Sequence, residues 1–281
     1  MGKLKLISSA GQYRKYTHTT DGGKETTGVH VFTTNTSQSI AAMIERNKTA
    51  LANMNPANVS PSKVIAKING GMMNNRSTTE FYGFYYQGDS EPMYIDGEEF
   101  DELPSSSILY SDFKYYPSFC VKSDGTAMIR WFSSKSDAEL ALRYCDYVIG
   151  AAHPIVYKSK NVFTSAVRED AVYGGALIYD SNDPGSSDSR FNPNIDYRTA
   201  QRTLLGHKTN KTYVMVATDG SMSIESAAEL MCDLQCDYAV NLDGGGSTQM
   251  RVASGYGPTS GGKVTAGSGR VLNSAIAAYI K

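Results

Sequence analysis

One strand–helix–strand segment constrains the fold more than any other part of the chain. Residues 212–218 (TYVMVAT) are apolar and β-branched and predict a strand, which the turn Asp219-Gly220 follows. Behind the capping residue Ser223, apolar residues recur at helical spacing and predict a helix over residues 224–234. Residues 238–242 (YAVNL) predict a second strand. The segment therefore predicts a β-α-β unit with parallel strands.

The remaining elements predict helices and strands in mixture. Apolar residues at roughly helical spacing predict a helix over residues 40–51, and residues 63–68 (KVIAKI) predict a strand. Further elements are a strand over 128–132, a short capped helix over 136–144 and a final strand over 271–279. The predicted fold class is α/β (mixed α+β): a single domain with a mixed β-sheet core, flanking helices and long surface loops.

Two polar segments predict the loops. Residues 181–197 contain prolines, glycine and many polar residues and predict a long surface loop. Residues 255–269 are rich in glycine and serine and predict a mobile flap. Loops of this length often carry function.

The composition is that of a globular protein without a global electrostatic field. The 281 residues are 41% hydrophobic and 20% charged, with a net charge of −1. Extended binding to nucleic acid or to an anionic membrane therefore has little support. We find no apolar run of about 18 residues and no signal-peptide core after Met1, which predicts a cytoplasmic protein, or a virion-associated or otherwise exported one. The oligomeric state stays open.

Cysteine and histidine spacing favours neither a disulfide framework nor a zinc site. The four cysteines are scattered and predict buried free thiols, and the four histidines stand far apart in sequence. We expect no cofactor. A calcium- or magnesium-dependent variant stays open, because Asp219, Asn241 and Asp243 offer oxygen ligands.

The most informative short motif is the segment NLDGGGST over residues 241–248. A predicted strand ends in the carboxylate Asp243, and three glycines and two hydroxyls follow. Glycines let the backbone approach a ligand, and exposed amides can line an anion site. In isolation, a tight turn in which Asp243 caps its own backbone is the more common structure.

Two further motifs acquire meaning only beside the first. Asn69-Gly70-Gly71 follows the strand over residues 63–68 and is, alone, an ordinary turn. Arg198 and Arg202-Thr203 precede a Leu-Leu-Gly segment; a guanidinium there could grip phosphate or form a surface ion pair.

Together and in this order, the three motifs resemble the phosphodiester glycosidase family, whose hallmarks are an NGG turn, an RT-x-x-G strand and an NLDGGGS-type loop. Residues 149–156, which include His153, and residues 270–273 are similar to further family segments. Met72 and Met73 replace the usual aromatic pair. The resemblance implies a catalytic domain over residues 30–281, with residues 1–29 as a strand or extension of the same domain.

The resemblance also implies the site. Catalytic roles fall to Asp243, Arg202 and Asp219. Substrate contacts fall to Asn69, Gly70, Gly71, Thr203, Gly244, Gly245, Gly246, Ser247, Arg270 and Asn273.

The implied reaction is hydrolysis of the glycosidic bond of a sugar-1-phosphodiester, such as an N-acetylglucosamine-1-phosphodiester. Asp243 would attack the anomeric carbon or activate water, and Arg202 with the amides of residues 244–246 would hold phosphate. Two alternatives stay open. One is a non-catalytic glycan-binding module of a phage or cell-surface protein, and the other is a phosphodiesterase that cuts the P–O bond.

Overall fold

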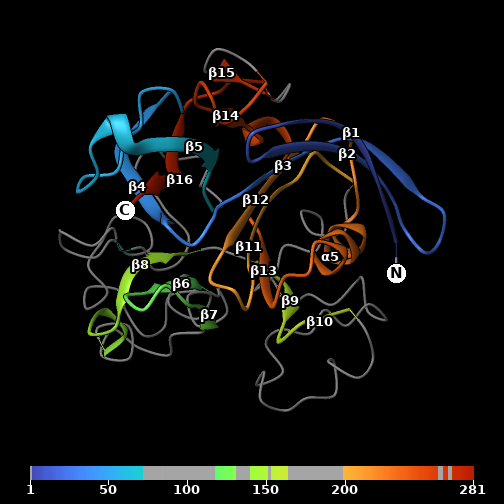
Figure 1. Cartoon of the computed structure of the whole chain (residues 1–281), viewed down its shortest axis with the longest axis horizontal. Helices are drawn as coiled ribbons and strands as arrows, with labels where there is room; N and C mark the ends of the chain where they lie inside the picture. Colours follow the sequence, from blue (N-terminus) through green and yellow to red (C-terminus); the bar gives the residue numbers. More distant parts are fainter. Residues whose placement is uncertain are drawn as a thin grey trace, which may run out of the picture.

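The computed structural model describes residues 2–71, 86, 118–130, 140–150, 153–163, 199–258, 262–264 and 268–281. Within these residues the chain is built mainly of β-strands in three sheets (Figure 1). The longest α-helix there, α5 (Ile224–Asp233), has ten residues, and residues 140–142 form a helical turn. Helix is therefore scarcer than the sequence predicted.

The largest sheet has eight strands. In spatial order these are β1 (Lys3–Ala10), β2 (Tyr13–Thr19), β3 (Glu25–Thr33), β12 (Tyr213–Thr218), β11 (Thr203–His207), β13 (Tyr238–Asn241), β9 (His153–Tyr157) and β10 (Lys160–Asn161). Every pairing in it is antiparallel. The predicted β-α-β unit with parallel strands β12 and β13 is present, but the two strands are not neighbours in the sheet. They run in the same direction, but β11 lies between them and bonds to both.

A second sheet of five strands packs against the first. Its order is β15 (Gly262–Lys263), β14 (Met250–Val252), β5 (Val64–Asn69), β16 (Leu272–Ile280) and β4 (Gln38–Thr49), and the short 3₁₀ turn η1 (Pro61–Lys63) precedes β5. A third sheet has the order β7 (Ala127–Arg130), β6 (Ser118–Lys122) and β8 (Cys145–Ile149). Pairing is again antiparallel within both. The predicted mixed sheet is thus antiparallel in the described part of the chain.

The predicted helix over residues 40–51 is wrong, because this segment forms β4 and the turn after it. Ile40 and Ala42 face the core between the two large sheets, whereas Met43 belongs to a cluster on the other side of its sheet. A strand buried on both faces has no clean alternation of apolar and polar residues. Its apolar run therefore mimicked one face of a helix.

Strand β12, like β4, is buried on both faces, and it therefore joins the core between the large sheets to the layer that contains α5. On β12, Met215 points into the core between the large sheets, and Val214 and Val216 pack toward α5. Burying each such side chain contributes about 1.5–3 kcal/mol, so the apolar run TYVMVAT stabilises both layers. The hydroxyl of Ser223 accepts a hydrogen bond from the Ser226 amide at 3.2 Å and caps α5, as predicted.

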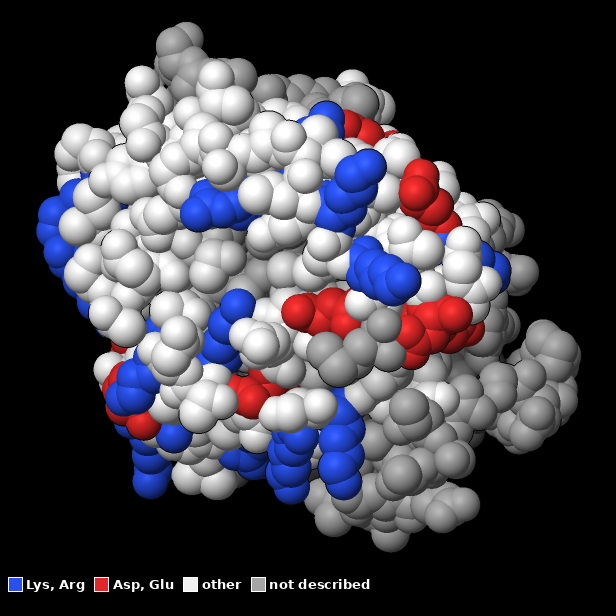
Figure 2. Space-filling model, turned by 45° about the vertical axis from the view of Figure 1, so that its right-hand side comes forward, with Lys and Arg blue, Asp and Glu red and all other residues white. Residues whose placement is uncertain are grey.

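Two properties of the surface bear on partners. On the face shown in Figure 2, basic and acidic side chains are interspersed, in keeping with the net charge of −1. Among the described residues, no helix is long and apolar enough to cross a membrane.

Candidate active site

The site lies where strand ends from the two large sheets meet. After β13, the Leu242 amide donates to the Thr203 carbonyl at 2.8 Å, within the eight-stranded sheet. The next amide, that of Asp243, donates to the Gly70 carbonyl at 3.1 Å, at the end of β5 in the other sheet. The backbone before the glycine loop thus changes sheet at Asp243. That transfer fixes the position of the carboxylate.

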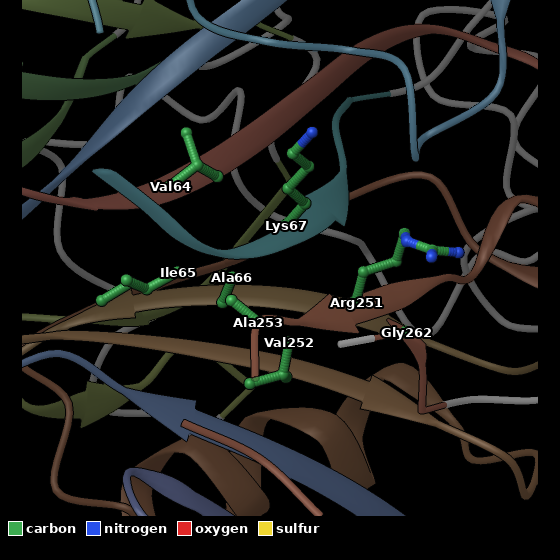
Figure 3. Close-up of a pocket in the computed structure, with 8 residues that line it drawn as sticks. All are labelled: Val64, Ile65, Ala66, Lys67, Arg251, Val252, Ala253 and Gly262. Atoms are coloured by element: carbon green, nitrogen blue, oxygen red, sulfur yellow. The ribbon is translucent and has the colours of Figure 1, made fainter. Parts of the chain in front are cut away.

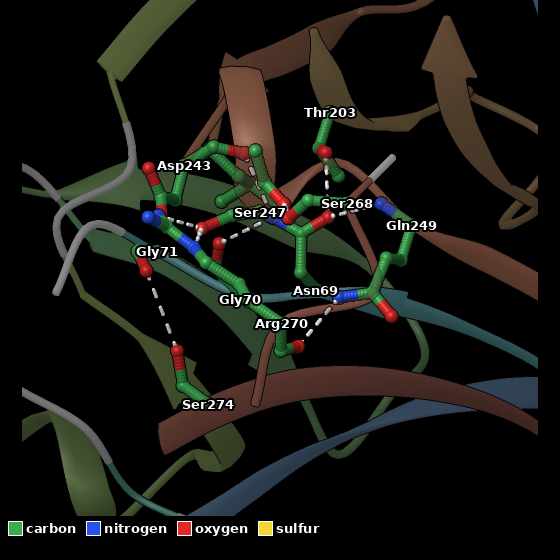
Figure 4. A network of polar contacts seen from close by, with 12 residues as sticks. Asn69, Gly70, Gly71, Thr203, Asp243, Ser247, Gln249, Ser268, Arg270 and Ser274 are labelled. Atoms are coloured by element: carbon green, nitrogen blue, oxygen red, sulfur yellow. Dashed lines mark hydrogen bonds and ion pairs between the residues drawn. The ribbon is translucent and has the colours of Figure 1, made fainter. Parts of the chain in front are cut away.

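Asn69 locks this junction from within (Figure 4). Its side chain is buried, and Nδ2 donates to the Asp243 carbonyl at 2.7 Å. Its Oδ1 accepts from Thr203 Oγ1 at 2.6 Å and from the Gln249 amide at 3.0 Å. The amide group of Asn69 is therefore occupied by protein atoms, and it joins β5, β11 and the loop before β14.

Asp243 has a buried and charged environment. Its carboxylate lies 3.0 Å from Arg270 Nη2, and the side chains of Asp243 and Arg270 are 18% and 36% exposed. Arg270 Nε also donates to Ser247 Oγ at 2.6 Å. Burial raises the pKa of Asp243, while hydrogen bonds from Ser247, Arg270 and the Gly244 amide and the charge of Arg270 act in the opposite direction. The carboxyl is a stronger base than an ordinary aspartate.

The glycines of the loop are required by close packing and by backbone geometry. A side chain on Gly244 would lie 2.7 Å from the Gln201 carbonyl, and Gly245 has φ +57°. The Gly245 amide donates to that carbonyl at 2.8 Å, and the turn η4 (Gly245–Ser247) follows. Ser268 Oγ donates to the Gly246 carbonyl at 2.6 Å. The amides of Gly244 and Gly245 thus donate hydrogen bonds to other groups of the protein, namely the Asp243 carboxylate and the Gln201 carbonyl.

Asp219 lies at the same edge of the eight-stranded sheet. It follows β12, and Gln201 Nε2 donates to its carbonyl at 2.9 Å, while the Gln201 carbonyl receives the Gly245 amide. We call this strip, with Asp219, Gln201 and Asp243 at the ends of β12, β11 and β13, the carboxylate edge. Two adjacent strand spacings separate the strands carrying the two aspartates, roughly 10 Å.

Comparison with known proteins identifies the family of this chain. The sequence profile of the phosphodiester glycosidase family (NAGPA) matches residues 62–279. This chain belongs to the phosphodiester glycosidase family. No curated protein matches it in sequence.

Two of the solved structures that share the fold of this chain illustrate the similarity. One is the catalytic domain of zebrafish N-acetylglucosamine-1-phosphodiester alpha-N-acetylglucosaminidase auto-inhibited by its pro-peptide, at TM-score 0.63 and 12% identity over 100% of this chain and 83% of that one. The other is a hypothetical protein from Synechocystis, at TM-score 0.55 and 13% identity over 99% of this chain and 64% of that one.

Not every site residue predicted from the sequence of this family member lies at the Asp243 network. Arg202 is 2% exposed, and its Nε donates to the Met222 carbonyl at 3.1 Å. Asn273 is buried and donates to the Glu45 carbonyl at 3.1 Å. Gly70 does lie at this network, because its carbonyl accepts the Asp243 amide at 3.1 Å. It packs so closely on Ser274 that a side chain would meet the serine Oγ at 2.4 Å, and the Gly71 carbonyl accepts from the same hydroxyl at 3.4 Å.

Some predictions lie outside the described residues. These are Arg198, Met72, Met73, the loop over 181–197, parts of the flap over 255–269 and parts of the elements at 128–132 and 136–144. Of His153, the backbone is described and pairs with Asn241. Among described residues, no group of three or more His, Cys, Asp or Glu side chains is arranged to hold a metal ion.

Sequence reasoning missed four polar residues that complete the site: Gln201, Gln249, Ser268 and His30. Gln249 Nε2 donates to the Arg270 carbonyl at 2.9 Å and so ties the arginine to the glycine loop. Gln201 precedes the Arg-Thr motif directly, and this adjacency was a signal in the sequence. His30 Nε2 lies 2.7 Å from Asp219 Oδ2, but 189 residues separate the two in sequence, so nothing in sequence spacing pointed to this contact.

A pocket outside this network lies over the five-stranded sheet (Figure 3). It has a volume of about 190 Å³, and apolar residues of β5 and residues 252–253 form most of its lining. Lys67, at its rim, donates to the carbonyls of Ala52 and Met54 and to Asn55 Oδ1. Its ammonium group is therefore engaged in holding the segment before η1.

Proposed function

We propose that the chain hydrolyses the glycosidic bond of a sugar-1-phosphodiester of the N-acetylglucosamine-1-phosphodiester type. The observation that carries the proposal is the hydrogen bond from Arg270 to Asp243, the residue just before the glycine loop. It places a basic carboxyl beside a guanidinium that is 36% exposed. Family membership and the activity named for the zebrafish protein support the same reaction.

The two side chains suit the two halves of the reaction. As the bond from the anomeric carbon to the phosphate oxygen breaks, its electron pair stays on the phosphate monoester, which is a stable anion. Arg270 would bind that developing charge. Asp243 would act on the other side, either by attacking the anomeric carbon or by taking the proton of the attacking water, and burial raises its pKa toward that of an effective base.

Asp219 is the proposed second carboxylate. Carboxyl groups about 6.5–9.5 Å apart leave room for a water molecule and typify inverting glycosidases, whereas about 5–5.5 Å typifies retaining ones. Attack by water would invert the anomeric configuration, whereas attack by Asp243 followed by hydrolysis of the intermediate would retain it. The configuration of the sugar released first, followed by proton NMR, tests this choice.

The other predicted contacts take different places in the proposal. Asn69 and Thr203 hold the Asp243 loop through their mutual hydrogen bond. A phosphate contact by Arg202, or by the loop amides, stays a prediction. We assign the phosphate to Arg270, because its guanidinium lies beside Asp243 and its side chain is 36% exposed, whereas Arg202 is 2% exposed.

Product analysis tests the function. The protein is incubated with UDP-N-acetylglucosamine and with an N-acetylglucosamine-1-phospho-6-mannoside. Free N-acetylglucosamine supports the proposal. Sugar-1-phosphate would instead identify a phosphodiesterase, and binding without turnover across a panel of such donors would identify a glycan-binding module.

A matched pair of variants shows whether the activity belongs to the site. Asp243→Asn removes the carboxylate after β13 and should abolish release of sugar. Asp237→Asn changes the acid just before the same strand, where Asp237 accepts from Ser159 and Thr209, and should leave release unchanged. Equal activity in the two variants would place the reaction elsewhere.

A further inference from the structure

A chain of hydrogen bonds runs from the interior to Asp219. The Tyr13 hydroxyl lies 2.7 Å from His30 Nδ1, and His30 Nε2 lies 2.7 Å from Asp219 Oδ2. Tyr13 and His30 are each 2% exposed, whereas the Asp219 side chain is 31% exposed. Tyr13 on β2 and His30 on β3 both precede residue 62, where the family match begins. The match therefore assigns them no role.

The protonation states along this chain follow from its chemistry. A carboxylate only accepts, so His30 Nε2 carries the proton and donates it to Asp219, which leaves Nδ1 to accept from the Tyr13 hydroxyl. Burial lowers the pKa of His30, although Asp219 acts to raise it, and burial raises the pKa of Tyr13 to about 12. Near neutral pH a neutral imidazole, fixed in one tautomer by Tyr13, donates to Asp219.

Other contacts fix the same carboxylate from neighbouring elements. Lys15 Nζ on β2 lies 3.8 Å from Asp219 Oδ2. The Asp219 amide donates to the Gly28 carbonyl at 2.9 Å, and a side chain on Gly28 would come within 2.7 Å of Asp219 Cβ. A hydrogen-bond donor and a nearby cation both favour the charged form of a carboxylate.

We infer that His30 is a positioning residue that holds Asp219 as an oriented, charged carboxylate at the carboxylate edge, with Tyr13 fixing the imidazole behind it. The inference rests on the proposed function. Asp219 is the second carboxylate of that proposal, and here its negative charge would stabilise the positively charged, oxocarbenium-like sugar of the transition state. The N-terminal strands thus contribute a working part of the site.

The test compares His30→Ala with His30→Gln, whose amide can keep a donor near the position of Nε2. His30→Ala should lower kcat at least about tenfold with KM nearly unchanged, and His30→Gln should stay within about threefold of the parent kcat. If His30→Ala does not fold, Tyr13→Phe takes its place and should lower kcat in the same direction. Melting temperatures of all variants separate loss of fold from loss of rate.

A double-mutant cycle shows whether His30 acts through Asp219. In the Asp219→Asn background, His30→Ala should cost no further activity, because the carboxylate that it orients is gone. In solution, NMR titration of the His30 imidazole should show a lower pKa in Asp219→Asn and a higher one in Lys15→Met, since the carboxylate raises it and the cation lowers it.

The possible outcomes distinguish failure of the role inferred for His30 from failure of the proposed hydrolase function. Parent-like kcat in His30→Ala, or a further full loss in the Asp219→Asn background, overturns the role of His30 and leaves the hydrolase in place. A parent protein that turns over no sugar phosphodiester overturns the proposed function, and the inference falls with it.

Discussion

Asp243 and Asp219 lie at the same sheet edge, but their surroundings differ. Asp243 is the more buried of the two, and it shares Arg270 with Ser247 in a loop that changes sheet. Asp219 is more exposed. It accepts a hydrogen bond from the neutral imidazole of His30 and lies near the ammonium group of Lys15, both from the N-terminal strands. Burial is thus the largest influence on the pKa of Asp243, despite its contacts with Arg270 and Ser247, whereas Asp219 is more open to solvent. Such a contrast assigns different chemical roles to two carboxylates.

Replacing each aspartate tests this contrast, and the largest loss of turnover is expected at Asp243. Asp243→Asn should reduce turnover roughly a thousandfold, because a positioned acid or base contributes about 10²–10⁴ in rate. Asp219→Asn should cost less, about tenfold to a hundredfold. Steady-state kinetics and melting temperatures are measured on the same preparations. Equal losses, or a larger loss at Asp219, would erase the division of roles.

Arg270→Gln should cost about a hundredfold in kcat/KM, through the lost stabilisation of phosphate. It should also move the acid limb of the pH profile. Arg270 lowers the pKa of Asp243, so its removal raises that pKa further, and a reaction that needs the charged carboxylate then begins at higher pH. An acid limb that stays in place would show that Asp243 does not titrate in the reaction.

Asn69→Ala should lower the free energy of unfolding by about 1–3 kcal/mol, because the Thr203 hydroxyl and the Gln249 amide lose their buried acceptor. Urea denaturation measures the loss. Asn210→Ala, in an exposed turn, is the matched control and should stay within about 0.5 kcal/mol. Similar values for the two variants would mean that the junction holds without Asn69.

Arg202→Lys distinguishes two roles of a buried guanidinium. If Arg202 mainly holds the Met222 carbonyl, the variant should lose about 1–3 kcal/mol of stability and keep its turnover within a few-fold. If it binds phosphate, turnover should fall at unchanged stability. Kinetics and denaturation on one sample decide between them, and the first result would leave Arg270 as the phosphate ligand.

The smallest expected effect is that of metal removal. We expect turnover to survive dialysis against EDTA. In the proposed reaction Asp243 supplies the base and Arg270 the positive charge, so no metal ion is required. Loss of activity on EDTA treatment that calcium or magnesium restores would favour the metal-dependent variant instead.

Local signals in the sequence predicted part of this molecule well. The cap at Ser223, the helix behind it and the strand before Asn69 are each specified by neighbouring residues, and all three are present. The β4 segment was misread because burial on both faces hides the strand period. The insertion of β11 between β12 and β13 depends on pairing over long sequence separation, which no local pattern encodes.

The candidate site divides in the same way. The Asp243 loop was visible as a contiguous motif, because chemistry and turn geometry both require its residues side by side. The link from Tyr13 through His30 to Asp219 was invisible, because three separate strands bring the side chains together. Burial also decided between Arg202 and Arg270 in our proposal, and a sequence does not display the exposure of an arginine.

The start of the family match at residue 62 has a consequence for truncation of the chain. Strand β3 is bonded to β12 in one sheet, and β4 is bonded to β16 in the other. A chain trimmed to the matched region would expose an unpaired edge in both sheets, and open edges invite aggregation. The family profile therefore covers less of the chain than the strands that pair in the two large sheets.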